Sequence, residues 1–115
     1  MVDPTLTQEI TALHADICSA LADPKRILIL YALNEKPRNV SELAEDLGMN
    51  QPAASRHLML LRERGLASAQ RDGQSVVYSL IDNRVIQALD LLREVLASKL
   101  KNQGALAQNI NSETK

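Results

Sequence analysis

The stretch that decides the fold, residues 40–61, reads VSELAEDLGMNQPAASRHLMLL. It predicts two short helices joined by a tight turn. Gly48 stands at the expected end of the first helix. Helices often end at a residue in the left-handed conformation, which glycine adopts easily because it has no Cβ. Asn50 can cap the second helix, and Pro52 stands in its first turn, where a missing N–H breaks no hydrogen bond. The pattern predicts a helix-turn-helix.

Apolar spacing assigns an inward and an outward face to the second helix. The inward set is Ala54, Leu58 and Leu61, and the outward set is Gln51, Ser55 and Arg56. A helix of this kind is shaped to enter the major groove of DNA. A helical hairpin of a bundle and a winged helix that binds protein are the alternatives.

Length and composition restrict the kind of protein. The chain has 115 residues, so we expect one domain over residues 1–101 and a polar, frayed tail over residues 102–115. No apolar run approaches the ~20 residues of a membrane span, and no signal-peptide pattern begins the chain. We therefore expect a cytoplasmic protein. The single cysteine, Cys18, excludes an intramolecular disulfide and a multi-cysteine zinc site within one protomer.

Charge is distributed unevenly along a chain whose net charge is −1. Residues 1–23 contain four acidic side chains and no lysine or arginine, whereas residues 50–74 contain four arginines against one glutamate and one aspartate. Local positive charge attracts nucleic acid even where the whole protein is nearly neutral. The excess of arginine thus coincides with the predicted DNA surface.

Two helices are expected ahead of the helix-turn-helix, over residues 4–22 and 25–34. Asp23 precedes Pro24 as an N-cap precedes a first-turn proline. A polar connection over residues 35–38 follows, and the third helix should start at an Asn39 capping box.

A β-hairpin is expected directly after the helix-turn-helix. Residues 66–71 and 75–80 are strand-like and flank an Asp-Gly turn at 72–73. Arg71 and Gln74 would then lie near a tip able to reach phosphates or a minor groove. The predicted fold class is mainly α with a small β-hairpin: a winged helix-turn-helix followed by a C-terminal helix.

The two terminal helices carry more apolar surface than one neighbour would cover. After a cap at Asp82, a ridge runs along the last helix, expected over residues 83–101: Val85, Leu89, Leu92, Leu96 and Leu100. The first helix has a similar stripe: Leu6, Ile10, Leu13, Ile17 and Leu21. We infer a two-fold homodimer built from these helices. The alternative is that they cover each other within one protomer.

Four motifs in this order resemble the ArsR/SmtB family of bacterial winged helix-turn-helix repressors. They are LADPKRILIL at 21–30, SELAEDLG at 41–48, NQPAASRHLMLLRERGL at 50–66 and RDGQSVVYSL at 71–80. The resemblance implies a homodimeric repressor that leaves its operator when it binds an inducer, often a metal ion or a thiol-reactive species.

The positions that bind inducers in the family differ here. One metal-sensing type has a Cys-x-Cys pair where this chain has Asn39 and Ser41. Another type has a set of ligands where this chain has Asp82, Arg84, Val95 and Ser98. These side chains cannot form a tetrahedral zinc site, and the sulfur-sensing members need two cysteines. The resemblance therefore predicts no cofactor or metal and leaves the inducer unknown.

The expected partner is double-stranded DNA with a pseudo-palindromic operator. The candidate contacts are Gln51, Pro52, Ser55, Arg56, His57, Arg71, Gln74 and Lys25. Glutamine pairs with adenine and arginine pairs with guanine. Lys25 would contact phosphate. His57 would either contact phosphate or simply lie on the flank of the helix. Arg26 could contact phosphate, or it could equally tie helices together. We expect Arg62 and Arg64 to be solvated or paired with Glu63 and neighbouring residues.

His14 and Cys18 are four residues apart and therefore share one helix face. They could supply two soft metal ligands, and a dimer would supply four. The favoured interpretation is a buried cysteine beside an exposed histidine. A Cys18–Cys18 bridge across a dimer is a further hypothesis. No catalytic constellation is visible, so we do not expect an enzyme. Two alternatives to a DNA-binding regulator are a winged-helix protein-interaction module and a metal-binding protein without operator specificity.

Overall fold

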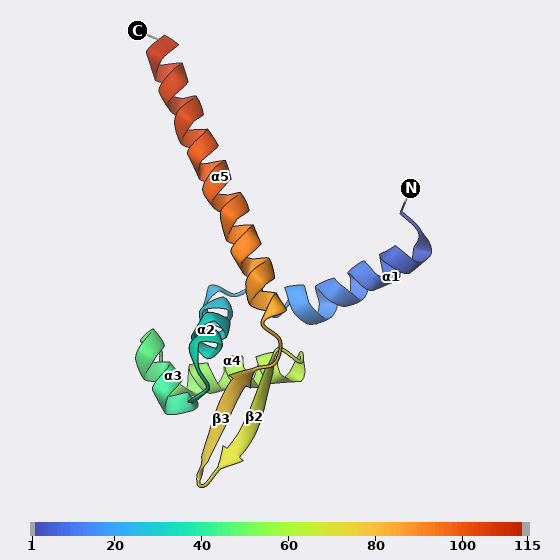
Figure 1. The fold of residues 1–115 in the computed structure, drawn as a ribbon, viewed down its shortest axis with the longest axis vertical. Coiled ribbons are helices and arrows are strands. Elements are labelled where there is room, and N and C mark those ends of the chain that lie inside the picture. Colours follow the sequence, from blue (N-terminus) through green and yellow to red (C-terminus); the bar gives the residue numbers. More distant parts are fainter. Residues whose placement is uncertain (1, 114–115) are drawn as a thin grey trace. The chain divides into compact units, whose positions relative to one another are not determined.

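The computed structural model describes residues 2–113, with side chains over residues 2–104. The chain divides into two compact units, one ending at Asn83 and one beginning at Arg84. Figure 1 labels the α-helices and the two longer strands. The single domain expected over residues 1–101 remains a prediction.

The first helix changes its hydrogen-bond register before it ends. α1 (Pro4–Leu13) starts at Asp3, whose carboxylate accepts the Leu6 N–H at 2.8 Å. It continues as a π-helical turn, η1 (His14–Cys18), in which the Ser19 N–H donates to the His14 carbonyl at 3.0 Å. A continuous α-helix over residues 4–22 was therefore wrong in its last part.

Local capping signals determine where the next three helices begin. These helices are α2 (Pro24–Glu35), α3 (Val40–Leu47) and α4 (Gln51–Glu63). Each begins after a residue whose side chain accepts a backbone N–H of the first turn: Asp23, Asn39 and Asn50 respectively. Asn39 and Glu42 also form the predicted capping box. All three predicted caps are confirmed.

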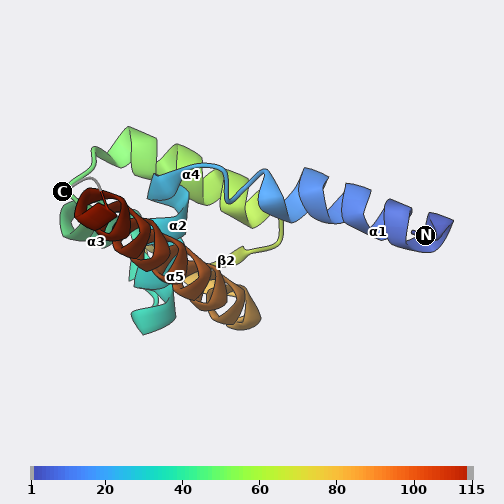
Figure 2. The ribbon, with the colours of Figure 1, turned by 90° about the horizontal axis from the view of Figure 1, so that it is seen from above.

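α2 lies at the centre of the first unit, where it contacts α3, α4 and β3. Figure 2 shows it against α4. The largest fully buried side chains come from these helices: Ile29, Leu30, Leu43, Leu58 and Leu61. Burying a leucine or isoleucine is worth about 1.5–3 kcal/mol. This aliphatic core therefore holds α4 in place by its inward face, as predicted from the spacing of Ala54, Leu58 and Leu61.

The sheet has three antiparallel strands in the order β1-β3-β2, one more than the predicted hairpin. They are β1 (Arg38–Asn39), β2 (Ala67–Asp72) and β3 (Ser75–Leu80). β1 falls in the predicted polar connection and pairs with β3, with Arg38 opposite Tyr78. Asp72 is opposite Ser75, so Gly73 and Gln74 form the turn, one residue later than predicted.

Arg38 is buried, with 7% of its surface exposed, because two carboxylates neutralise its charge. Its guanidinium lies 2.8 Å from Glu35 Oε2 and 2.9 Å from Asp46 Oδ2. These ion pairs join the end of α2 to α3. Removing one partner of such a buried charge is strongly destabilising, which makes Arg38 structural rather than a solvated connection residue.

The second unit is one helix, α5 (Arg84–Glu113). It continues past Lys101 as far as Glu113. The polar, frayed tail expected over residues 102–115 stays a prediction, and its last two residues lie outside the described part of the chain. Residues 102–113 include two alanines and two glutamines, which favour helix, and one glycine, which costs about 1 kcal/mol. Within residues 2–113, no helix is long and apolar enough to cross a membrane.

Candidate nucleic-acid interface

The turn between α3 and α4 is short and fully specified by local bonds. Gly48 ends α3 with φ 65° and ψ 35°, the left-handed conformation that the sequence predicted. The Met49 N–H then donates to the Ala44 carbonyl at 2.9 Å. Asn50 accepts the Ala53 N–H at 2.8 Å and starts α4. These contacts set the direction of α4 against the core.

One face of α4 is exposed along its whole length and lies opposite the buried Ala54, Leu58 and Leu61. By helical spacing this outward face comprises Gln51, Pro52, Ser55, Arg56, Met59, Arg62 and Glu63. All are exposed except Ser55, which is half-buried. The structure thus brings four of the predicted DNA contacts onto one surface of one helix.

Arg56 and Met59 occupy the middle of this face. Arg56 makes no hydrogen bond or ion pair with any described residue, so its guanidinium is free to bind an external acceptor. Met59 keeps 58% of its surface exposed, a large apolar side chain one turn beyond Ser55. Such a side chain can contact the methyl group of thymine in a major groove.

The hairpin of β2 and β3 projects from the helices of the first unit (Figure 1). Gly73 starts its turn with φ 63°, a conformation that favours glycine. Arg71 and Gln74 are both exposed near this tip. Lys25 is exposed at the start of α2, beside the cap at Asp23.

The comparisons with known proteins agree with this geometry. Residues 23–69 match the family model described as "Bacterial regulatory protein, arsR family". The chain is 45% identical over 85 residues to the HTH-type transcriptional regulator NmtR of Mycobacterium tuberculosis, covering 74% of this chain and 71% of that protein. This chain belongs to the ArsR family. It is a DNA-binding transcriptional regulator.

Two solved structures of the same type superpose well on this ArsR-family chain. NolR from Sinorhizobium fredii is 37% identical with a TM-score of 0.72, covering 83% of this chain and 94% of that one. The homodimeric winged helix-turn-helix DNA-binding domain Mb0332 from Mycobacterium bovis is 28% identical with a TM-score of 0.73, covering 88% and 93% respectively. The predicted winged helix-turn-helix is confirmed.

His57, on the flank of α4 in this ArsR-family chain, faces into the protein rather than freely outward. It is half-buried, and its Nδ1 lies 3.5 Å from Nη1 of Arg26. Arg26 in turn donates to the Ala20 carbonyl at 2.7 Å and the Ser19 carbonyl at 3.3 Å. Arg26 therefore ties the end of the first helix to α4, one of the two roles considered for it.

Arg64 is neither solvated nor paired with Glu63, so that expectation was wrong. Its guanidinium donates to the Ala15 carbonyl and, at 2.8 Å, to Ser19 Oγ. The π-helical turn explains this acceptor, because the Ser19 N–H bonds His14 rather than Ala15. The Ala15 carbonyl is thus left to side-chain donors, which are the Ser19 hydroxyl and Arg64. Arg64 thus links the end of α4 to η1.

His14 and Cys18 are both exposed, so the favoured expectation of a buried cysteine was wrong. Among the described side chains, no group of three or more His, Cys, Asp or Glu residues could hold a metal ion. At the family's Cys-x-Cys positions, Asn39 caps α3 and Ser41 accepts a hydrogen bond from Gln51. These residues do not fit a metal. The Cys18–Cys18 bridge stays a prediction.

Sequence reasoning missed two residues of the candidate interface. Met59 lies four residues after Ser55, and that spacing alone places it on the outward face. Ser41 lies on α3 and accepts a hydrogen bond from Gln51 Nε2 at 2.9 Å. No spacing rule predicts this second contact, because it joins two helices across the turn.

Proposed function

We propose that this regulator is a homodimeric repressor whose α4 reads a pseudo-palindromic operator. The observation that carries the proposal is the outward face of α4. Arg56 has no partner among the described residues there, and Gln51 and Ser55 lie beside it on the same face. Arginine pairs with guanine and glutamine with adenine through two hydrogen bonds each, worth about 1–3 kcal/mol of discrimination. The exposed Arg71 and Gln74 at the wing tip and Lys25 on α2 would add phosphate or minor-groove contacts.

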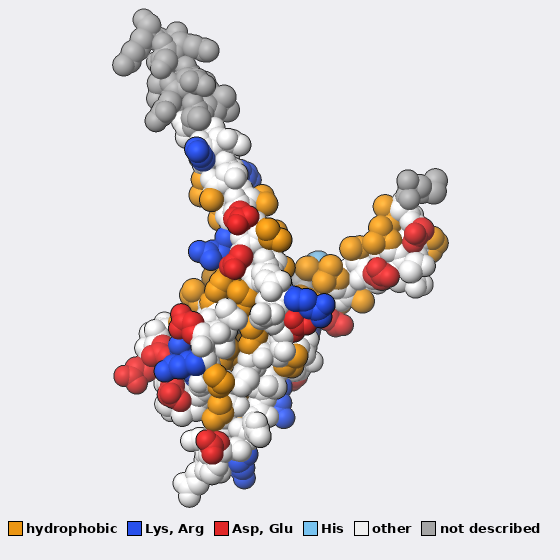
Figure 3. Space-filling model, in the orientation of Figure 1, with side chains coloured by type: hydrophobic (Ala, Val, Ile, Leu, Met, Phe, Trp, Pro, Cys, Tyr) orange, Lys and Arg blue, Asp and Glu red, His pale blue; other side chains and the backbone are white. Residues whose placement is uncertain are grey.

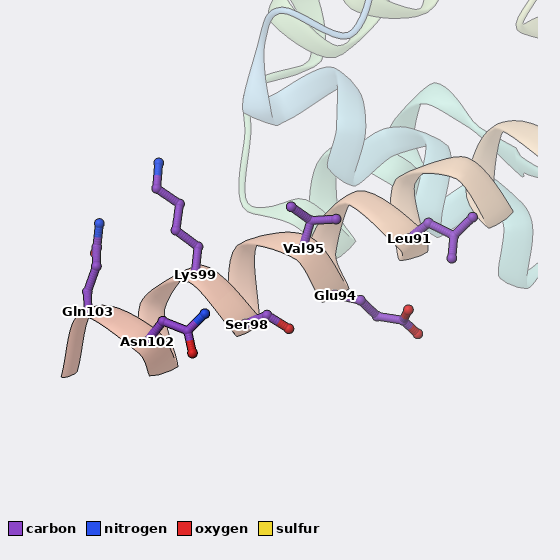
Figure 4. A pocket seen from close by; sticks show the side chains of 7 residues that line it. All are labelled: Leu91, Glu94, Val95, Ser98, Lys99, Asn102 and Gln103. Atoms are coloured by element: carbon purple, nitrogen blue, oxygen red, sulfur yellow. The ribbon is translucent and has the colours of Figure 1, made fainter. Parts of the chain in front are cut away.

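Exposed apolar faces on the terminal helices support a homodimer. On α1 these side chains are Leu6, Ile10 and Leu13, and on α5 they are Leu91, Leu92, Val95, Leu96 and Leu100. Figure 3 shows hydrophobic side chains in orange along each of these helices. Figure 4 shows Leu91 and Val95 beside a hollow formed by side chains of α5 alone. Soluble monomers rarely expose continuous apolar surface of this kind.

A two-fold dimer places two copies of α4 in successive major grooves, about 34–36 Å apart. That spacing predicts the two related half-sites of the operator. Bound across a promoter, the dimer would block transcription sterically in the cytoplasm. Release by an inducer would require only that the inducer favour a second dimer geometry, with a coupling of about 1–3 kcal/mol.

Selection of operators from random duplex DNA tests the proposal. We expect the wild-type chain to enrich one pseudo-palindromic sequence. Arg56→Ala should bind that sequence about 5- to 150-fold more weakly, with relaxed preference at one base position per half-site. Lys101→Ala, which removes an exposed charge from the side of α5 away from its leucines, is the matched control and should bind as the wild type does.

Two results would contradict the proposal. If no duplex is enriched and salt does not weaken binding to random DNA, a winged-helix protein-interaction module becomes the better interpretation. If an operator is enriched but Arg56→Ala binds it normally, α4 is not the reading helix.

A further inference from the structure

Ser41 and Gln51 connect the two helices of the helix-turn-helix through their side chains. Gln51 Nε2 donates to Ser41 Oγ at 2.9 Å. Ser41 is the second residue of α3, and Gln51 is the first residue of α4. Both side chains are exposed. A residue on α3 thus holds the first residue of the outward face of α4.

The chemistry of the amide group allows this bond and base recognition together. The side-chain amide is planar and carries two N–H donors and one carbonyl oxygen. Pairing with adenine uses the oxygen and the N–H on the same edge. The other N–H points away from that edge and is available to Ser41. A hydrogen bond to Ser41 through this second N–H would leave the adenine-pairing edge of the amide free.

The same bond reduces the cost of ordering Gln51 on DNA. A free glutamine side chain has rotamer freedom worth up to ~1.5–2 kcal/mol, which binding would remove. A side chain that is already held in one orientation loses less on binding. An amide held through its nitrogen also keeps its oxygen available as an acceptor for the amino group of adenine.

We propose that Ser41 is a specificity-determining positioning residue, which orients the Gln51 amide for an adenine in each half-site. This inference rests on the proposed function, because it requires Gln51 to face a base. Ser41 acts through Gln51 and contacts no base itself. It makes α3 part of the reading surface.

The fold does not depend on Ser41, so its role can be tested by substitution. The start of α3 is held by the capping box of Asn39 and Glu42. Leu43 and Ala44 provide its buried face. Replacing an exposed hydroxyl at the second helical position leaves both features unchanged. Circular dichroism and urea unfolding of Ser41→Ala should therefore match the wild type.

A double-mutant cycle with Gln51 provides the test. The affinity of the full-length chain is measured for its selected operator and for variants carrying each other base at the Gln51 position. We expect Ser41→Ala to reduce the preference for the A·T pair there about three- to tenfold, the value of one neutral hydrogen bond. Ser41→Thr, which keeps a hydroxyl, should restore it. Ser68→Ala on β2 is the control for loss of an exposed serine hydroxyl.

The background without Gln51 distinguishes the explanations. In Gln51→Ala, which lacks the amide, adding Ser41→Ala should have no further effect. If the second substitution lowers affinity equally for all sequences, Ser41 contacts phosphate and the inference is overturned. It is also overturned if Gln51→Ala keeps the full base preference. Failure of the proposed function is a different result, in which the wild-type chain selects no operator.

Discussion

Removing either of two arginines that bind the end of the first helix should destabilise the protein to different degrees. Arg26 donates to the Ala20 carbonyl, and Ala20 is completely buried. Arg64 donates to the carbonyl of Ala15, which is exposed. Arg26 also contacts the Ser19 carbonyl and His57 Nδ1 and lies 3.6 Å from Asp23 Oδ2. Arg64 has one further hydrogen bond, to Ser19 Oγ, so its substitution by alanine removes fewer contacts.

The carbonyl group that each substitution leaves behind increases this difference. Without Arg26, the Ala20 carbonyl is buried with a missing donor, which costs about 1–3 kcal/mol in addition to the lost bonds. We expect Arg26→Ala to lower the free energy of unfolding by about 2–4 kcal/mol. Without Arg64, water can reach the Ala15 carbonyl, and Arg64→Ala should cost about 1 kcal/mol.

Urea unfolding followed by circular dichroism measures both values. Because a dimer's apparent stability depends on its concentration, all variants must be compared at one protein concentration. Arg26→Lys is the control, since it keeps the charge but loses the planar fork of donors, and it should fall between the wild type and Arg26→Ala. Equal losses for the two alanine variants, or a larger loss for Arg64→Ala, would refute the reasoning.

Three further predictions follow from exposed positions. Gly48→Ala should lower the free energy of unfolding in urea by about 1–2 kcal/mol. The cost is backbone strain alone, because an added Cβ would meet nothing within 4 Å. A larger loss would contradict this. When uracil replaces thymine at one operator position, the wild type should lose about 1 kcal/mol of binding free energy, because the methyl group is absent. Met59→Ala should bind both operators equally well. Leu96→Glu should raise the dimer dissociation constant about 100-fold by ultracentrifugation, and Ala97→Glu, on the other face of α5, should leave it unchanged. Equal effects of the two glutamates would show that the leucine face is not the interface.

The beginnings and ends of the central helices could be predicted from the sequence because their causes lie within one helical turn. Asn39 bonds the N–H of Glu42, and Asn50 bonds that of Ala53, each three residues along. Gly48 terminates α3 by its own conformation. Apolar spacing likewise identified the inward and outward faces of α4, and with them the face that carries Arg56.

The rest of the site was decided by tertiary structure, because its contacts join residues far apart in the chain. β1 becomes a strand only because Arg38 lies opposite Tyr78. Arg64 finds its acceptor on η1, 49 residues earlier, where a shifted backbone hydrogen bond has released a carbonyl. Ser41 meets Gln51 only once the turn has brought α3 against α4. The sequence by itself thus determined which residues α4 turns outward, whereas packing against other elements decided which arginine stays free for DNA and which glutamine is held in place.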